Sequence, residues 1–162
     1  MKQLNFLNHF NHYHTMKQIC LLLFISLMAA TFTSCKKDAN DFEGLRVTID
    51  GNAWTALTAT GASLGDNIAI TGADPVSLKS LLLLVPANIT AGTYNIGPTG
   101  DIQGTFSGGL TASYAADSGK LIITEHNTGD KRIKGTFDFD ATNVISGAAS
   151  VFTDGEFNLV YQ

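Results

Sequence analysis

The sequence predicts an all-β domain, either one antiparallel β-sandwich or a partly open β-barrel of about eight to ten short strands. All 16 glycines lie after residue 43, scattered among short runs rich in Thr, Val, Ile and Phe, as expected for strands joined by turns. Several of these runs alternate apolar and polar residues, which indicates strands with one buried face. No stretch after the first 44 residues repeats apolar residues at helical spacing.

The first predicted strands form a hairpin. Residues 45–49 alternate apolar and polar side chains, and Asp50-Gly51 follows at once. This dipeptide predicts a tight turn, because a type I′ turn requires positive φ at both central residues. Residues 53–60 are the expected return strand, in which Trp54 and Leu57 are opposite in phase. One of these two side chains should therefore face outward unless both sides of the strand are covered.

The middle of the chain continues in the same way. Further strands are expected at residues 67–71, 81–85, 92–97, 110–115 and 120–126. The run LLLLV at 81–85 fits a strand buried on both faces, although a short helix could carry the same run. Asp117-Ser118-Gly119 is expected to be a turn, and the glycine-rich residues 100–109 a mobile loop.

The clearest strand is KRIKGTFDFD at residues 131–140, where apolar and charged side chains alternate. Gly135 lies on its apolar face and indicates a bulge or a close neighbour. Asp154-Gly155 is either a tight turn or a bulge, and the closing strand covers residues 156–161. The inner face of the sheet is expected to include Ile133, Phe137, Phe139, Phe157 and Leu159.

Residues 16–34 have the pattern of a cleaved leader. A cationic start is followed by an apolar run at residues 19–32, which is too short for a membrane span of about 20 residues but fits a signal peptide. Phe32-Thr33-Ser34-Cys35 resembles a bacterial lipobox, in which the cysteine thiol takes a diacylglycerol. Lipidation of Cys35 is therefore predicted over a free cysteine. Residues 1–15 are interpreted as an extension in front of the true start at Met16.

Cleavage before Cys35 would leave a chain of 128 residues. Residues 35–44 form a lipidated tether and residues 45–162 one β domain, a typical domain size. With Cys35 acylated, no disulfide or thiolate metal site is possible in the domain. Its 8 Lys and Arg against 14 Asp and Glu give a side-chain charge of −6, which argues against a nucleic-acid partner.

Candidate catalytic groups are few. His126 is the one histidine after the leader, and no G-x-S-x-G motif accompanies it, so an exposed histidine at a strand end is expected. Asp138 and Asp140 share one face of a strand, where paired carboxylates could act in acid–base chemistry or bind Ca²⁺. A solvated sheet face is favoured, because there is no D-x-D-x-D-G loop. We therefore expect no enzyme activity, no metal and no cofactor.

Trp54 is the best single candidate for ligand binding, because an indole can stack on a sugar ring. Aromatic side chains also dominate ordinary cores, since each buries a large area. A structural tryptophan is therefore favoured over a binding one.

Four short motifs resemble a family of small Bacteroidota lipoproteins that is classed only as a domain of unknown function. They are Asp50-Gly51 with Trp54-Thr55-Ala56, Ala91 to Gly97, Lys131 to Phe139, and Asp154 to Phe157. The resemblance covers the whole chain from Leu45 to Tyr161. It implies an all-β, lipid-anchored domain and supplies no activity or site residue.

A lipid anchor, a tether and a small β domain suit a non-catalytic binding or assembly module. The expected location is the outer membrane, facing the periplasm or the cell surface. A glycan-binding module should expose an aromatic patch around Trp54, whereas a module that binds a protein should present an apolar patch or an unpaired strand edge. The enzyme alternative is a hydrolase that uses His126 or the Asp138/Asp140 pair.

Overall fold

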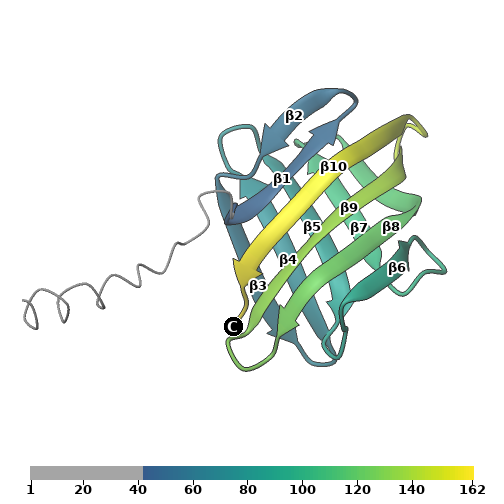
Figure 1. Ribbon diagram of the computed structural model, residues 1–162. Coiled ribbons are helices and arrows are strands. Elements are labelled where there is room, and N and C mark those ends of the chain that lie inside the picture. The colour runs from purple at the N-terminus through teal and green to yellow at the C-terminus, as the bar shows by residue number, and fades with distance from the viewer. Residues whose placement is uncertain (1–41) are drawn as a thin grey trace, which may run out of the picture. The chain divides into compact units, whose positions relative to one another are not determined.

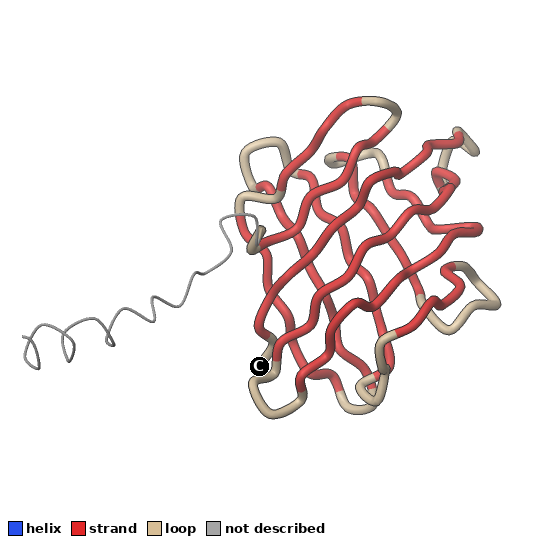
Figure 2. The backbone as a smooth tube through the Cα atoms, viewed as in Figure 1, coloured by secondary structure: helices blue, strands red, loops and turns tan. Residues whose placement is uncertain are grey.

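The computed structural model describes residues 42–162, and all regular structure in this range is β-strand (Figure 2). The strands are β1 (Gly44–Ile49), β2 (Asn52–Thr55), β3 (Thr58–Leu64), β4 (Asn67–Asp74), β5 (Lys79–Pro86), β6 (Gly92–Ile96), β7 (Gln103–Gly108), β8 (Ser113–Asn127), β9 (Arg132–Asn143) and β10 (Ala149–Val160). The predicted all-β class is confirmed. The leader, Cys35 and the tether up to residue 41 lie outside the described residues.

The ten strands form one antiparallel sheet in the order β2-β1-β10-β9-β8-β7-β5-β4-β3, with β6 paired to β8. The sheet curls into a half-barrel, so that two groups of strands cross face to face (Figure 1). We call β8, β9, β10, β1 and β2 the front layer and β3, β4, β5 and β7 the back layer. Of the two predicted architectures, the partly open barrel is the one observed.

The C-terminal residues connect the end of β10 to the edge strand β3 at one end of the half-barrel. Tyr161 forms a parallel bridge with Gly61 of β3. The Gln162 amide donates to the Gly61 carbonyl at 3.1 Å, and the Ser63 amide donates to the Gln162 carbonyl at 2.7 Å. Pairing at this point protects part of the β3 edge, which would otherwise present unpaired backbone groups.

Part of the core consists of aromatic rings that lie over glycines. On the inner side of the front layer, three phenylalanines each face a glycine on the neighbouring strand. The pairs are Gly119–Phe139, Gly155–Phe137 and Gly135–Phe157. A Cβ added to Gly155 would lie 2.5 Å from the Phe137 ring, so no other residue fits there without movement. The five predicted inner residues are all buried, which confirms that prediction.

The structure settles several local predictions. Asp50 and Gly51 have φ of 50° and 79°, as the predicted type I′ turn requires. Asp154-Gly155 is a bulge within β10, since the register with β9 shifts between Phe152 and Gly155. The LLLLV run is a strand: Leu81, Leu83 and Val85 are buried and the two leucines between them are half-buried.

Three local predictions were wrong. Asp117-Ser118-Gly119 is not a turn but part of the continuous strand β8. Gly119 serves close packing instead, because an added Cβ would lie 2.4 Å from Cβ of Phe139. Residues 100–109 contain the strand β7, and the expected strand at 53–60 is divided between β2 and β3.

Every buried side chain of the described core lies between Leu45 and Tyr161. The chain that follows Cys35 therefore contains the complete described fold.

We predict that Gly61→Ala weakens the junction between β3 and the C-terminus. The new Cβ would lie 2.5 Å from Cβ and 2.9 Å from Cα of Tyr161, so backbone must move. Overpacking of this kind costs about 1–3 kcal/mol. Urea unfolding of residues 36–162 should show that loss. Gly92→Ala is the matched control, since its Cβ would meet only the Tyr94 side chain at 3.5 Å. Equal stability of the two variants would contradict the proposed role of Gly61.

Candidate functional site

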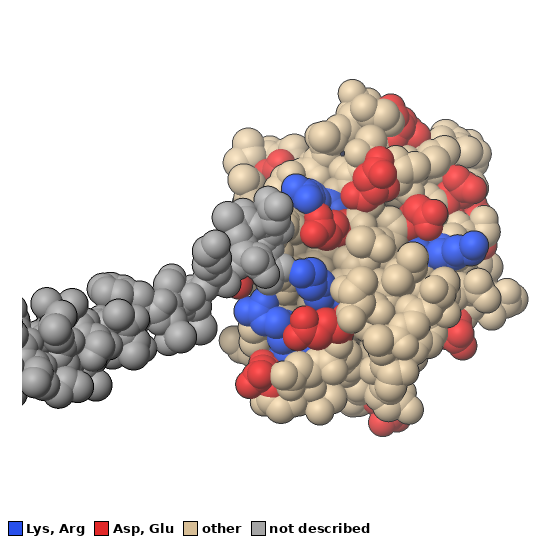
Figure 3. Space-filling view, viewed as in Figure 1, with Lys and Arg blue, Asp and Glu red and all other residues tan. Residues whose placement is uncertain are grey.

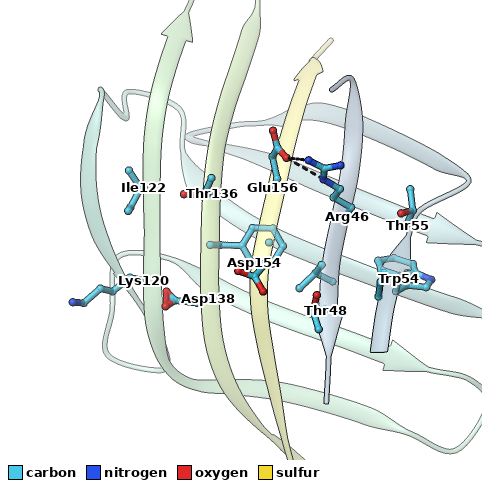
Figure 4. A pocket seen from close by; sticks show the side chains of 14 residues that line it. Arg46, Thr48, Trp54, Thr55, Lys120, Ile122, Thr136, Asp138, Asp154 and Glu156 are labelled. Atoms are coloured by element: carbon cyan, nitrogen blue, oxygen red, sulfur yellow. Dashed lines mark hydrogen bonds and ion pairs between the residues drawn. The ribbon is translucent and has the colours of Figure 1, made fainter. Parts of the chain in front are cut away.

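A shallow groove of about 590 Å³ crosses the outer surface of the front layer (Figure 4). Residues from β2, β1, β10, β9 and β8 line it. Much of its lining is one row of paired side chains: Thr55, Arg46, Glu156, Thr136 and Ile122. The groove therefore runs across the strands, and its residues come from segments far apart in the sequence.

The groove carries hydroxyls and charges of both signs. Arg46 Nε donates to Glu156 Oε2 at 3.0 Å. Lys120 is the cross-strand partner of Asp138. Asp154, which the β10 bulge places at φ 53°, also lines the groove. This lining suits hydrogen bonding to a polar ligand, and its mixed charges do not select an anion or a cation.

Trp54 borders the groove but belongs to the core. Its side chain is only 8% exposed, and its ring packs edge-on against Phe106 with centroids 5.9 Å apart. The indole nitrogen points away from the other labelled side chains of the groove (Figure 4). Leu57, at 65% exposure, is the residue of this pair that faces outward. Trp54 therefore offers no flat surface on which a sugar ring could stack.

His126 is half-buried, so the expectation of an exposed histidine was wrong. Its Nδ1 lies 2.6 Å from the carbonyl oxygen of Ile89, and its Nε2 lies 2.9 Å from the hydroxyl of Tyr161. A neutral ring satisfies both contacts by donating from Nδ1 and accepting at Nε2. In this arrangement His126 ties the loop after β5 to the C-terminal end of β10, and its hydrogen-bond partners are neither a serine nor a carboxylate.

Asp138 and Asp140 are exposed on the outer face of β9, as the favoured interpretation predicted. Asp138 lies in the groove, and Asp140 lines a smaller depression beside Val151. Within residues 42–162, no three His, Cys, Asp or Glu side chains come together as a metal ion would require.

One end of the half-barrel carries an apolar surface that the sequence did not predict. Five large apolar side chains occupy turn segments there and are between 52% and 91% exposed. We call them the apolar rim: Val76, Leu78, Leu110, Val144 and Ile145. Turn residues are usually polar or glycine, so this composition is unusual.

The three turns of the apolar rim are neighbours. The β4–β5 turn ends at Lys79, which pairs with Gly108, the last residue of β7. The β7–β8 turn ends at Ser113, whose carbonyl accepts a 2.8 Å hydrogen bond from the Val144 amide. Val144 begins the β9–β10 turn. Strand pairing thus gathers the five side chains, although 69 residues separate the first from the last.

Asp74 organises the β4–β5 turn. Its carboxylate accepts hydrogen bonds from the Ser77 hydroxyl and from the amides of Ser77 and Val76. These bonds, above all the one from the Ser77 hydroxyl, hold the pKa of Asp74 below its usual range. The stability that these bonds give the fold is therefore present above the pKa of Asp74 in the unfolded chain, and it is lost as pH falls through the pKa of Asp74 in the folded protein. Leu78 completes the turn at φ 57°, a conformation that strains a leucine.

Comparison with known families identifies residues 43–160 with the family described as domain of unknown function DUF6252. The chain belongs to this family. The match spans all the strands from β1 to β10. It stops before Tyr161 and Gln162, which pair with β3 at the C-terminus. No curated protein and no solved structure matches the chain. Among the residues that the structure describes, no helix is long and apolar enough to span a membrane.

We predict that Trp54→Ala destabilises this DUF6252 domain by about 3–5 kcal/mol, because it removes a buried aromatic side chain and leaves a cavity. Trp54→Phe keeps a ring against Phe106 and removes a smaller part of the buried side chain, including an indole nitrogen that has no hydrogen-bond partner, so it should cost much less. Urea unfolding of both variants measures the difference. A Trp54→Ala domain as stable as the native one would show that the tryptophan is not structural.

Proposed function

We propose that this protein is a non-catalytic interaction module of the cell envelope, anchored through a lipid on Cys35 and bound to a partner protein through the apolar rim. The observation that carries the proposal is the gathering of five exposed apolar side chains on three adjacent turns. The leader at residues 16–34 and the lipobox-like Phe32-Thr33-Ser34-Cys35 support the anchor.

The position of the rim suits a partner away from the membrane. β1 begins at Gly44 and runs toward the β1–β2 turn, which adjoins the β9–β10 turn through hydrogen bonds between Asp50 and Val151. The tether thus enters the domain at the end opposite the rim. The nine residues from 36 to 44 connect Cys35 to the start of β1, and a chain of this length spans at most about 30 Å. A domain held in this way points its rim away from the bilayer.

The energetics favour burial of the rim by a protein. Full burial of one Val, Leu or Ile side chain stabilises by about 1.5–3 kcal/mol, so covering five partly exposed ones would contribute on the order of 7 kcal/mol before the entropy cost of association is subtracted. Leu78 adds a second argument, because a glycine would adopt φ 57° with less strain. The turn itself therefore does not explain a leucine at this position. Contact between the leucine side chain and a partner protein would explain it.

A glycan-binding function is the second candidate, and the groove on the front layer supports it. Thr48, Thr136 and the Lys120–Asp138 pair could hydrogen-bond to sugar hydroxyls. The burial of Trp54 weighs against this function, because it removes the expected stacking surface. The hydrolase alternative has less support than the glycan-binding one, since both ring nitrogens of His126 have structural partners.

We predict that the mature protein begins at an acylated Cys35. Intact-mass analysis of protein purified from membranes should find residues 35–162 with added lipid mass. Cys35→Ser removes the thiol and should give a product that is uncleaved or no longer membrane-bound. A native N-terminus at another residue, without lipid mass, would contradict the anchor.

We predict that a photo-crosslinking amino acid at Leu110 captures a partner protein in intact cells. The same group at Thr136, an exposed residue of the groove, is the matched control. Val76→Ser together with Ile145→Ser should abolish the Leu110 crosslink, since a serine cannot replace the buried apolar contact, while leaving the domain folded by circular dichroism.

Equal crosslinking from Leu110 and Thr136 would contradict the proposed role of the rim. Retention of the domain on a glycan array, lost in Lys120→Ala or Asp138→Ala but unaffected by the rim substitutions, would favour the glycan alternative instead.

A further inference from the structure

The back layer presents an outer face without charge. Its four strands contain 29 residues, of which only Asp74 and Lys79 are charged. These two pair at the β4–β5 turn, in phase with the buried residues Ile70 and Leu81 rather than with the outward ones. We call the outward positions of β3, β4, β5 and β7 the uncharged face.

The centre of the uncharged face is a row of four paired residues: Thr60, Thr71, Leu82 and Thr105. The next row contains Ala62, Ala69, Leu84 and Gln103. The remaining outward positions hold only Ser, Thr, Ala, Asn, Leu or Pro. Small side chains on a regular sheet make an even surface, and the two central leucines, which are half-buried, supply apolar area.

The front layer is the opposite in character. Excluding β2, its four strands contain 45 residues, and ten of these are Lys, Arg, Asp or Glu. Charged side chains of both signs are spread over its outer surface (Figure 3). The two outer faces of one curled sheet therefore differ sharply, although both would carry charged residues if each only faced water.

We infer that the uncharged face is a docking surface for a second copy of this chain, so that two domains pair back to back. Residues 42–162 contain 6 basic and 12 acidic residues, so two copies would repel each other if they met through their charged surfaces. Contact through the uncharged faces places no charged side chains opposite one another and leaves both charged faces outermost. Two stacked sheets already lie about 10 Å apart, so the charged front layers of the two copies would be farther apart than that. At physiological salt, charges separated by more than about 8 Å are largely screened.

The size of the face fits such a pair. Four strands spaced about 4.8 Å apart and about 24 Å long cover on the order of 450 Å² in projection. The two copies together would therefore bury roughly 1,000 Å², which is near the lower limit for a specific interface. A dimer of moderate affinity follows. It uses a different surface from the apolar rim, so the partner protein and the second copy do not compete.

Sedimentation velocity of residues 36–162 at 0.15 M salt tests this inference. The native domain should shift from monomer to dimer as its concentration rises to the hundred-micromolar range. Thr71→Lys places a charge at the centre of the uncharged face and should weaken dimerisation at least tenfold. Thr136→Lys places the same charge on the front layer and should leave the dimer unchanged. Both variants reduce the net charge of the domain equally, so a difference between them reports the local contact.

A disulfide test locates the contact. Residues 36–162 contain no cysteine, so Thr71→Cys introduces a single thiol near the expected two-fold axis. Mild oxidation should give a covalent dimer with Thr71→Cys and far less with Thr136→Cys. A native domain that stays monomeric at every concentration, or a dimer that Thr71→Lys does not weaken, would overturn the inference.

Discussion

The packing of aromatic rings over glycines on adjacent strands is the constraint on which the rest of this structure depends. In three cross-strand pairs of the front layer, a glycine has no side chain, and the phenylalanine ring on the neighbouring strand occupies the space that this leaves. Phe139 then stacks on Phe152 with centroids 4.4 Å apart, and Phe106 and Trp54 continue the contact edge-on. The row of rings thus links the two layers.

The same pairs coincide with the irregularities that curl the sheet. Register shifts adjoin Gly119 in β8, Gly155 in β10, and Ile123, which is the partner of Gly135. A bulge bends and twists its strand, so the long strands wrap around the rings instead of running flat. This curvature makes one sheet into both layers. It also leaves the outer groove beside the Asp154 bulge and sets three turns side by side at the rim.

Local patterns predicted most of the strands, but not β7, the division between β2 and β3, or the role of every glycine. The alternation in residues 131–140 and 45–49 predicted the inner face correctly, because period-two burial is a local property. Gly119 was misread, since a turn glycine and a packing glycine look alike in sequence; the difference is the ring of Phe139, which pairing brings alongside. The apolar rim could not be predicted, because its five residues become neighbours only through the β5–β7 and β8–β9 pairings. For Trp54 the sequence favoured a structural role over a binding one, and the structure buries the ring against Phe106.

The three surfaces of the domain differ because different requirements act on them. The front layer is charged on its outer face and needs only to face water or a polar ligand. The apolar rim keeps exposed side chains, including a strained Leu78, that water alone would disfavour. The uncharged face keeps leucines and threonines where a solvated sheet would carry Lys or Glu. If two copies pair through that face and each carries the proposed lipid on Cys35, each dimer has two anchors and two rims. The second anchor would then hold the assembly on the membrane far longer than one alone, because both must leave before the protein escapes.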